Sequence, residues 1–354
     1  MIAQLKKLPC FISDGFFIFY IYFTYAVFKY RFRHGIMMKN RGGCQMNDEI
    51  VTRTELFFEN VSAFNEAMRI RGNVMPGIAS AYIASAGIRV GAADIKRCYD
   101  VLKDMNGVLS YARGEMAPVM IAAMIRDEGV FSIEKYNEAY AALKRQLKAN
   151  QFTALCAVLL ACSKGNEEFE SVSAAAREQY ECFRRKHGFR IFIMDGMNYV
   201  ISAVDGSDPE EKADIADEIF RLSRSAYRFR LPWSSAQILA LKDGDTAAKC
   251  SDAVELKGRI KEYVRGASFY YELESMLLDP SGTLERLDDI MAVRDVLNED
   301  RRFKKWQMYE DIRLAIAGLL VHPDRDMLFI AASGSLKRTQ NNNSAVTVAV
   351  IATS

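Results

Sequence analysis

Glycines that recur at nearly constant spacing are the feature that most constrains how this chain can fold. Each closes an apolar segment, and after each the sequence becomes charged and amphipathic. Successive members are 42, 36, 41, 38 and 38 residues apart, at Gly87, Gly129, Gly165, Gly206, Gly244 and Gly282. Self-similarity at a period of about 20–50 residues is typical of repeat proteins, in which each repeat is one supersecondary unit. We therefore expect the chain to consist of copies of one unit.

The charged segment of each unit has the periodicity of a surface helix. Ile95, Cys98, Tyr99 and Leu102 recur at intervals of three and four residues, which places them on one face of an α-helix. The same kind of stripe occurs at 133–147, 215–222 and 287–297. Each of these helices is expected to bury one face.

Residues that start and end helices agree with this division. Asp208 precedes Pro209 and offers a side-chain acceptor for an N-cap, while the proline suits the first helical position. Ser132 and Thr283 offer hydroxyl caps in the equivalent breaks. The closing glycines suit the left-handed conformation that commonly ends a helix.

The apolar segments explain why several units are needed. The run FTALCAVLLAC at 152–162 is apolar nearly all round, so it must be covered on several sides, while an amphipathic partner covers only one. Stacking the next helix pair provides further cover. The sequence thus predicts an all-α fold, an α-solenoid of about six helix-hairpin repeats of the HEAT or TPR kind, each of roughly 36–42 residues, over residues 46–340. The tail at 341–354, with its run SAVTVAVI, fits a helix, a strand or a frayed end.

Residues 1–45 differ in character from the rest. Gly15–Phe28 is an apolar run of 14 residues, short for a helix that must cross about 30 Å of hydrocarbon. No small-residue cleavage site follows it, as a signal peptide would require. About half of residues 1–45 are Phe, Ile, Tyr, Lys or Asn, which AT-rich untranslated DNA encodes when read in frame. We interpret 1–45 as a mis-assigned extension before a start at Met46; the alternative is a membrane anchor.

A start at Met46 predicts the mass of the natively expressed protein. Intact-mass measurement is expected to give the mass of residues 46–354. A mass near the full 40.0 kDa would show instead that the first 45 residues are translated and retained.

Charge and cysteine content exclude several classes of partner and site. The chain has 47 Lys and Arg against 45 Asp and Glu, and removal of residues 1–45 leaves 40 basic against 44 acidic side chains. Nucleic-acid binding needs a clustered positive surface, so neither nucleic acid nor a membrane is expected as a partner. The seven cysteines have irregular spacing without a CxxC pair, which argues against a disulfide framework or a zinc site.

Motifs for catalysis are missing from the sequence. Outside the extension the only histidines are His187 and His322, and neither has a second histidine three or four residues away. The sequence contains no GxGxxG, GxxxxGK[ST] or GxSxG pattern. We therefore assign no catalytic residue, no metal ligand and no cofactor.

Two basic-aromatic loops are the candidate interaction surface. FRRKHGFR at 183–190 and YRFRLPW at 227–233 each connect the second helix of one unit to the first helix of the next, so in a regular stack they project from the same edge. Arginine and aromatic residues dominate binding hot spots. The alternative is structural, because basic residues stabilise helix C-termini and an aromatic after the break packs back on the preceding turn. The candidate residues are Arg184, Arg185, His187, Arg190, Arg228, Arg230 and Trp233.

The unit order and two runs of sequence resemble a known family. AQILALKDG followed by SDAVELKGRIKEY, together with FTALCAVLLACSKG, is similar to the bacterial helical family known only as domain of unknown function four thousand and three, over about residues 50–340. In that family a histidine, an apolar residue and acidic positions open the middle unit. His187, Phe189 and Asp195 resemble this pattern, and Gly196 departs from it. The resemblance implies bacterial origin and a helical fold, and it implies no activity.

Two functions fit these observations. The first is a cytoplasmic, non-enzymatic scaffold for an unknown protein partner, because solenoids present long continuous surfaces. The alternative is an enzyme or small-ligand binder with a cleft inside the superhelix, lined by residues such as Asp195, Tyr199 or Tyr271. Convergent carboxylates in a pocket would favour the second function, and a flat concave face would favour the first.

Overall fold

Helices follow one another along the whole described part of the chain. The computed structural model describes residues 46–68, 74–105, 111, 114–187, 196–226, 231–263, 272–300 and 310–337. Residues from Asp48 onward belong to one unit. Within the described ranges the fold is all-α, as predicted, and no helix there is long and apolar enough to cross a membrane. The extension 1–45 and the tail 341–354 lie outside these ranges.

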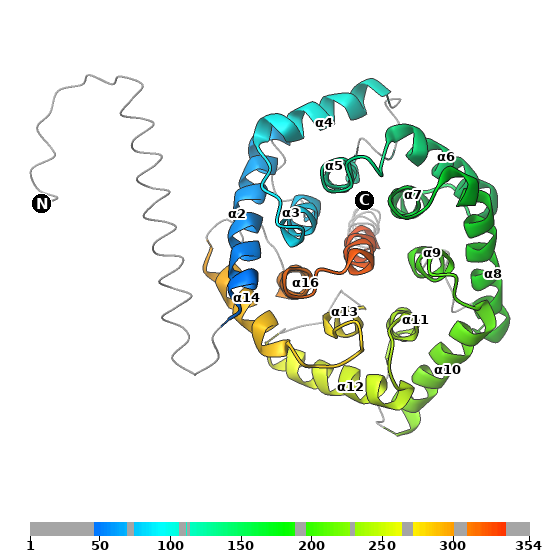
Figure 1. The fold of residues 1–354 in the computed structure, drawn as a ribbon. Helices are drawn as coiled ribbons and strands as arrows, with labels where there is room; N and C mark the ends of the chain where they lie inside the picture. The colour runs from blue at the N-terminus through cyan, green and yellow to red at the C-terminus, as the bar shows by residue number, and fades with distance from the viewer. Residues whose placement is uncertain are drawn as a thin grey trace, which may run out of the picture. The chain divides into compact units, whose positions relative to one another are not determined.

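The helices alternate between an outer and an inner layer (Figure 1). The outer helices are α2 (Asp48–Met68), α4 (Ala92–Met105), α6 (Ile133–Gln146), α8 (Phe169–His187), α10 (Pro209–Ser225), α12 (Thr246–Tyr263) and α14 (Leu287–Glu299). The inner helices are α3 (Met75–Ser85), α5 (Ala117–Arg126), α7 (Gln151–Ser163), α9 (Gly196–Val204), α11 (Trp233–Leu241), α13 (Leu273–Leu277) and α16 (Glu310–Val321). The described residues thus form seven pairs. The seventh inner helix, α16, ends at Val321 and is followed by His322 and not by a glycine, so glycine spacing does not reveal it.

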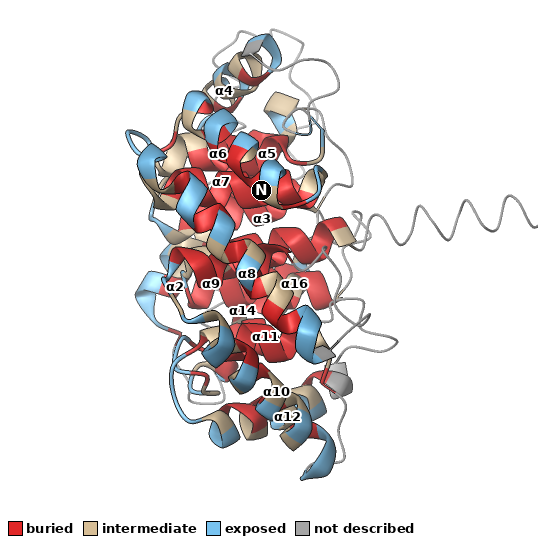
Figure 2. Ribbon diagram, turned by 90° about the vertical axis from the view of Figure 1, so that its right-hand side faces the viewer, coloured by how far each residue is buried: buried red, intermediate tan, exposed pale blue. Residues whose placement is uncertain are grey.

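Side-chain polarity accounts for the two layers. Inner helix α7 is buried at every position from Phe152 to Cys162. Its neighbour α6 buries only one stripe, which consists of Ile133, Tyr136, Ala139, Ala142 and Leu143. Figure 2 shows the same contrast, with the inner helices red and the outer helices partly pale blue. The period-3.6 stripes therefore mark outer helices, and the apolar runs mark inner ones.

The stack of helix pairs closes on itself. Inner helix α3 packs against α5 on one side and against α16 on the other, so the first and last inner helices are neighbours. At this seam the Arg53 guanidinium of α2 donates a hydrogen bond to the Leu320 carbonyl of α16 at 3.4 Å. The repeats therefore form a ring (Figure 1) and not an open arc.

A last helix, residues 325–337, fills the centre of the ring (Figure 1). Its residues from Met327 to Leu336 are buried. It contacts inner helices on different sides: Phe329 meets the ring of Tyr82 edge-on at 6.3 Å, and Arg325 donates to the Cys162 carbonyl at 3.3 Å. Near its other end Lys337 Nζ donates to Glu272 Oε1 at 2.8 Å. The central helix covers the inner face that an open solenoid would expose.

The predicted glycine turns are confirmed except at one position. Gly87, Gly129, Gly206, Gly244 and Gly282 have positive φ. At Gly282 a Cβ would lie 2.4 Å from Lys249 Cγ, so a side chain there is disfavoured both by backbone conformation and by packing. Gly165 has φ −76° and begins a 3-10 turn, in which its N–H donates to Glu168 Oε2 at 3.1 Å. The left-handed prediction for Gly165 was wrong because Glu168 caps this turn.

Two of the three predicted N-caps are confirmed. Asp208 Oδ1 accepts from the Glu211 N–H at 2.8 Å, and Ser132 Oγ accepts from the Lys135 N–H at 3.2 Å. The prediction for Thr283 was wrong. Its hydroxyl donates to Asp279 Oδ2 at 2.8 Å, and α14 begins only at Leu287.

Candidate functional site

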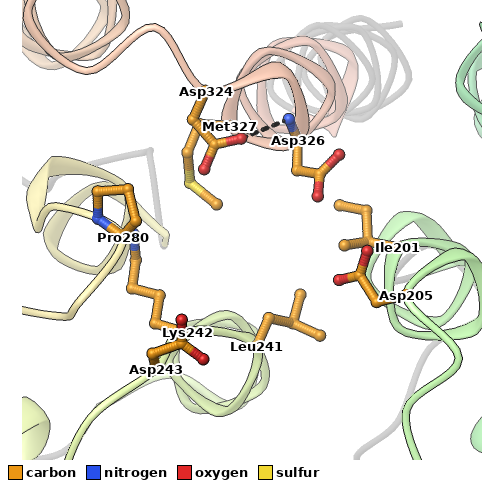
Figure 3. A pocket seen from close by; sticks show the side chains of 9 residues that line it. All are labelled: Ile201, Asp205, Leu241, Lys242, Asp243, Pro280, Asp324, Asp326 and Met327. Atoms are coloured by element: carbon orange, nitrogen blue, oxygen red, sulfur yellow. Dashed lines mark hydrogen bonds between the residues drawn. The ribbon is translucent and has the colours of Figure 1, made fainter. Parts of the chain in front are cut away.

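A pocket of about 120 Å³ lies where inner helices end and the central helix begins (Figure 3). A cavity needs at least about 10–15 Å³ on this measure to hold one water, so the pocket has room for several waters or a small organic molecule. Three parts of the ring and the central helix contribute its wall. The lining residues are Ile201, Asp205, Leu241, Lys242, Asp243, Pro280, Asp324, Asp326 and Met327.

Two of the four pocket aspartates lie on turns that follow inner helices. Asp205 follows α9, and its N–H continues the helical pattern to the Ile201 carbonyl at 3.0 Å. Asp243 follows α11, and its N–H donates to the Pro280 carbonyl at 3.2 Å. This second bond ties the end of α11 to the turn after α13. Both carboxylates therefore sit on connections fixed by backbone hydrogen bonds.

The start of the central helix supplies the other two carboxylates. Asp324 caps this helix, because its Oδ1 accepts from the Asp326 N–H at 2.8 Å and its carbonyl accepts from the Leu328 N–H at 3.4 Å. Figure 3 shows the Asp324, Asp326 and Asp205 side chains around one opening. The ring and its central helix thus bring four aspartates together from three separate segments.

Two of these carboxylates, those of Asp205 and Asp326, lie in an environment that penalises negative charge. Burial raises the pKa of Asp326 to about 7, and the neighbouring charges of Asp324 and Asp205 add to the effect. Arg325 opposes the shift, but its Nε lies 3.9 Å from Asp326 Oδ1. Burial also raises the pKa of Asp205. The pKa of Asp326 therefore lies in the neutral range, mainly because burial disfavours the charged carboxylate and secondly because two other carboxylates lie nearby.

Lys242 is the one basic side chain among the nine lining residues. It is 6% exposed, and its Nζ donates to the carbonyls of Leu278 at 2.9 Å and Asp279 at 3.0 Å. Burial lowers the pKa of Lys242 to about 8. Its two hydrogen bonds thus go to backbone carbonyls of the turn that follows α13.

The comparison with known families decides the membership of this chain. The family described as "Protein of unknown function (DUF4003)" matches residues 62–352. The chain belongs to this family. The resemblance seen in the runs at 152–165 and 236–263 is thereby confirmed. No curated protein and no solved structure matches the chain significantly.

Four pocket aspartates lie within the part of the chain that matches DUF4003, at positions 205, 243, 324 and 326. The described residues contain no group of three His, Cys, Asp or Glu side chains arranged to hold a metal ion.

The predicted interaction residues that the structure describes do not line the pocket. Arg184 and Arg185 occupy the exposed last turn of α8; Arg184 Nη1 lies 4.0 Å from Glu181, and Arg185 bridges to Glu210 at the start of α10 at 2.6 Å. Trp233 begins α11, whereas Lys242 follows its other end. The side chain of His187, and all of Arg190, Arg228 and Arg230, lie outside the described residues. Their role as an interaction site stays a prediction.

The described aromatic residues of the predicted interaction surface and of the predicted cleft have structural roles. Trp233 stacks on Phe220 of α10 with ring centroids 4.5 Å apart and planes 5° from parallel. Tyr199, an expected cleft residue, is 1% exposed in the core, where its hydroxyl accepts from Gln237 Nε2 at 3.3 Å. It does not line the pocket. Asp195 and Tyr271 lie outside the described residues.

Sequence reasoning missed the pocket aspartates, although a signal for two of them exists. Asp205 and Asp243 both stand directly before a closing glycine. Turns that close successive inner helices meet at one end of a stack, so a repeated Asp-Gly pair indicates carboxylates gathered there. Asp324 and Asp326 carry no such signal, because they follow α16, which lacks the glycine.

The raised pKa of Asp326 predicts a pH dependence of stability. Because the folded-state pKa lies above the usual 3.8, the folded protein binds more protons than the unfolded chain between about pH 4 and 7, and stability falls as pH rises through this window. Asp326→Asn removes the ionisation. Between pH 5.5 and 8 the wild type is expected to lose up to about 2 kcal/mol relative to Asp326→Asn, measured by urea unfolding.

The exposed Asp100→Asn on α4 is the matched control and is expected to follow the wild-type pH profile. Parallel profiles for the wild type and Asp326→Asn would contradict the electrostatic description of the pocket.

Proposed function

We propose that this protein binds a small, positively charged organic ligand in the central pocket. The observation that carries the proposal is the set of four aspartates around one cavity, two of which have a raised pKa through burial. Asp205 and Asp243 are exposed, and Asp324 and Asp326 are half-buried. Carboxylates whose pKa is raised by loss of solvent and by neighbouring negative charges are unfavourable in the ionised state, and such groups are concentrated at functional sites. A bound cation would stabilise the ionised form of these carboxylates and so offset the free-energy cost of their ionisation.

The size of the cavity narrows the ligand further. A volume of about 120 Å³ excludes polymers and large cofactors from its interior. Ile201, Leu241 and Met327 supply apolar surface beside the carboxylates, which fits a short carbon skeleton that carries an amine or guanidine group. Pockets of this kind combine apolar walls with a few placed polar groups.

The alternative proposal, a scaffold for an unknown protein partner, has less support. An open solenoid offers its concave face to partners, but here the ring closes and residues 325–337 fill the centre. The described basic residues of the predicted surface, Arg184 and Arg185, lie close to acidic side chains of the same or the next outer helix. The scaffold hypothesis therefore depends on residues 188–195 and 227–230, which lie outside the described residues.

We place this function in the bacterial cytoplasm as part of the proposal. The family resemblance supports a bacterial source. Cytoplasmic thiols are kept reduced, and the five described cysteines, at positions 98, 156, 162, 182 and 250, are free. This is the pattern expected of a protein from a reducing compartment.

Ligand-dependent thermal stabilisation tests the proposal. Small amines and guanidines, for example 1,3-diaminopropane, are expected to raise the Tm in a concentration-dependent way, because a ligand that binds only the folded state stabilises it. Neutral diols of the same length at matched ionic strength serve as controls and are expected to have no effect. Asp205→Asn and Asp326→Asn are each expected to weaken cation binding by about tenfold or more.

Asp100→Asn is the control for loss of one negative charge elsewhere, and it is expected to bind as the wild type does. Equal effects of amines and diols, or equal cation affinity in the wild type and in both pocket variants, would overturn the proposal.

A further inference from the structure

Lys242 is a buried amine that the proposed cation site does not use. It lines the pocket together with four aspartates, yet among the described residues its Nζ forms no ion pair with them, and its two hydrogen bonds go to backbone carbonyls. Figure 3 shows its side chain running along the pocket wall from the end of α11 towards Pro280. Lys242 therefore does not act simply as the counter-ion of a pocket carboxylate.

We propose that Lys242 forms a reversible imine with the carbonyl group of a small, positively charged amino ketone or amino aldehyde bound in the pocket. This inference rests on the proposed function, because it assigns the chemical class of the ligand that the same pocket binds. The aspartates hold the cationic end of the ligand, and Lys242 reacts with its carbonyl carbon.

The hydrogen bonds of Lys242 are compatible with a nucleophilic amine. An ammonium group has three N–H bonds and no lone pair, whereas a neutral amine has two N–H bonds and one lone pair. The carbonyls of Leu278 and Asp279 accept two N–H bonds, at 2.9 and 3.0 Å. The neutral amine can therefore keep both contacts and leave its lone pair free for a ligand.

Burial supports the same assignment. It lowers the pKa of Lys242 to about 8, against an ordinary value of 10.5. A larger fraction of the amine is consequently neutral near pH 7 than in an exposed lysine, and desolvation of this kind activates lysines that react with carbonyl compounds. The negative charges of Asp324 and Asp279 oppose this lowering of the pKa, and the positive charge of Lys249, which donates to the Lys242 carbonyl at 2.7 Å, adds to it.

The reaction balances without an oxidant or a reductant. The Lys242 lone pair forms the C–N bond while the carbonyl π pair moves to oxygen, and a proton passes from nitrogen to that oxygen. The resulting carbinolamine loses its hydroxyl group as water, and the nitrogen loses its second proton as C=N forms. The net change is an amine and a carbonyl converted to an imine and water.

Reductive trapping in the full-length protein tests this inference. Aminoacetone is the reagent, with neutral hydroxyacetone and anionic pyruvate as matched controls, and sodium cyanoborohydride reduces any imine to a stable secondary amine that peptide mass spectrometry locates. Lys242 is expected to be labelled at least about tenfold faster than the exposed Lys103, because more of its amine is neutral. Aminoacetone is expected to label Lys242 faster than hydroxyacetone, and pyruvate slowest.

The pH dependence and one variant complete the test. The labelling rate at Lys242 is expected to rise with pH with a midpoint near its pKa of about 8. Lys242→Arg has no primary amine that can form an imine, so it is expected to lose the covalent label.

The outcomes separate this inference from the proposed function. Stabilisation by aminoacetone with Lys242 labelled no faster than Lys103 would overturn the imine and leave cation binding in place. Loss of both stabilisation and selective labelling would overturn both proposals. The wild-type comparison of Lys242 with Lys103 decides the imine even if Lys242→Arg fails to fold.

Discussion

Inner helices that are apolar on every side are the constraint on which the structure depends. An outer helix such as α6 covers one side of α7, and the neighbouring inner helices α5 and α9 cover two more. The side facing the ring axis would stay exposed, and exposed apolar surface is unfavourable in water. Residues 325–337, themselves buried from Met327 to Leu336, cover it. Closure of the ring and the helix at its centre thus both serve to bury the apolar inner helices.

The pocket follows from where the central helix begins. The chain leaves α16 at His322 and enters the ring at the end where the Asp-Gly turns of α9 and α11 lie, so Asp324 and Asp326 arrive beside Asp205 and Asp243. Burial of these carboxylates raises the pKa of Asp326. Proteins tolerate an unfavourable environment for a charged group chiefly at functional sites. The arrangement therefore supports ligand binding at the centre more than partner binding at the rim.

Helix pairs, their layer and most of their turns could be predicted from sequence, because each depends on residues close together in the chain. Ser132 and Asp208 cap their helices as expected. Gly165 and Thr283 were mispredicted, since Glu168 and Asp279 offer competing hydrogen bonds. Ring closure could not be predicted, because it depends on contacts between α3 and α16, more than two hundred residues apart. The pocket aspartates are distant in the sequence, and nothing in the sequence shows that they meet unless ring closure is known.

Amide hydrogen exchange of residues 325–337 tests most directly whether this helix is the centre of the ring. In native conditions its amides from Leu328 to Leu336 are expected to exchange only through global unfolding, with the same free energy as the fully buried α7. The partly exposed outer helix α4 provides the comparison for exchange through local opening. Exchange of the 325–337 helix as fast as that of α4, or at a free energy well below that of α7, would contradict a ring closed around its C-terminal helix.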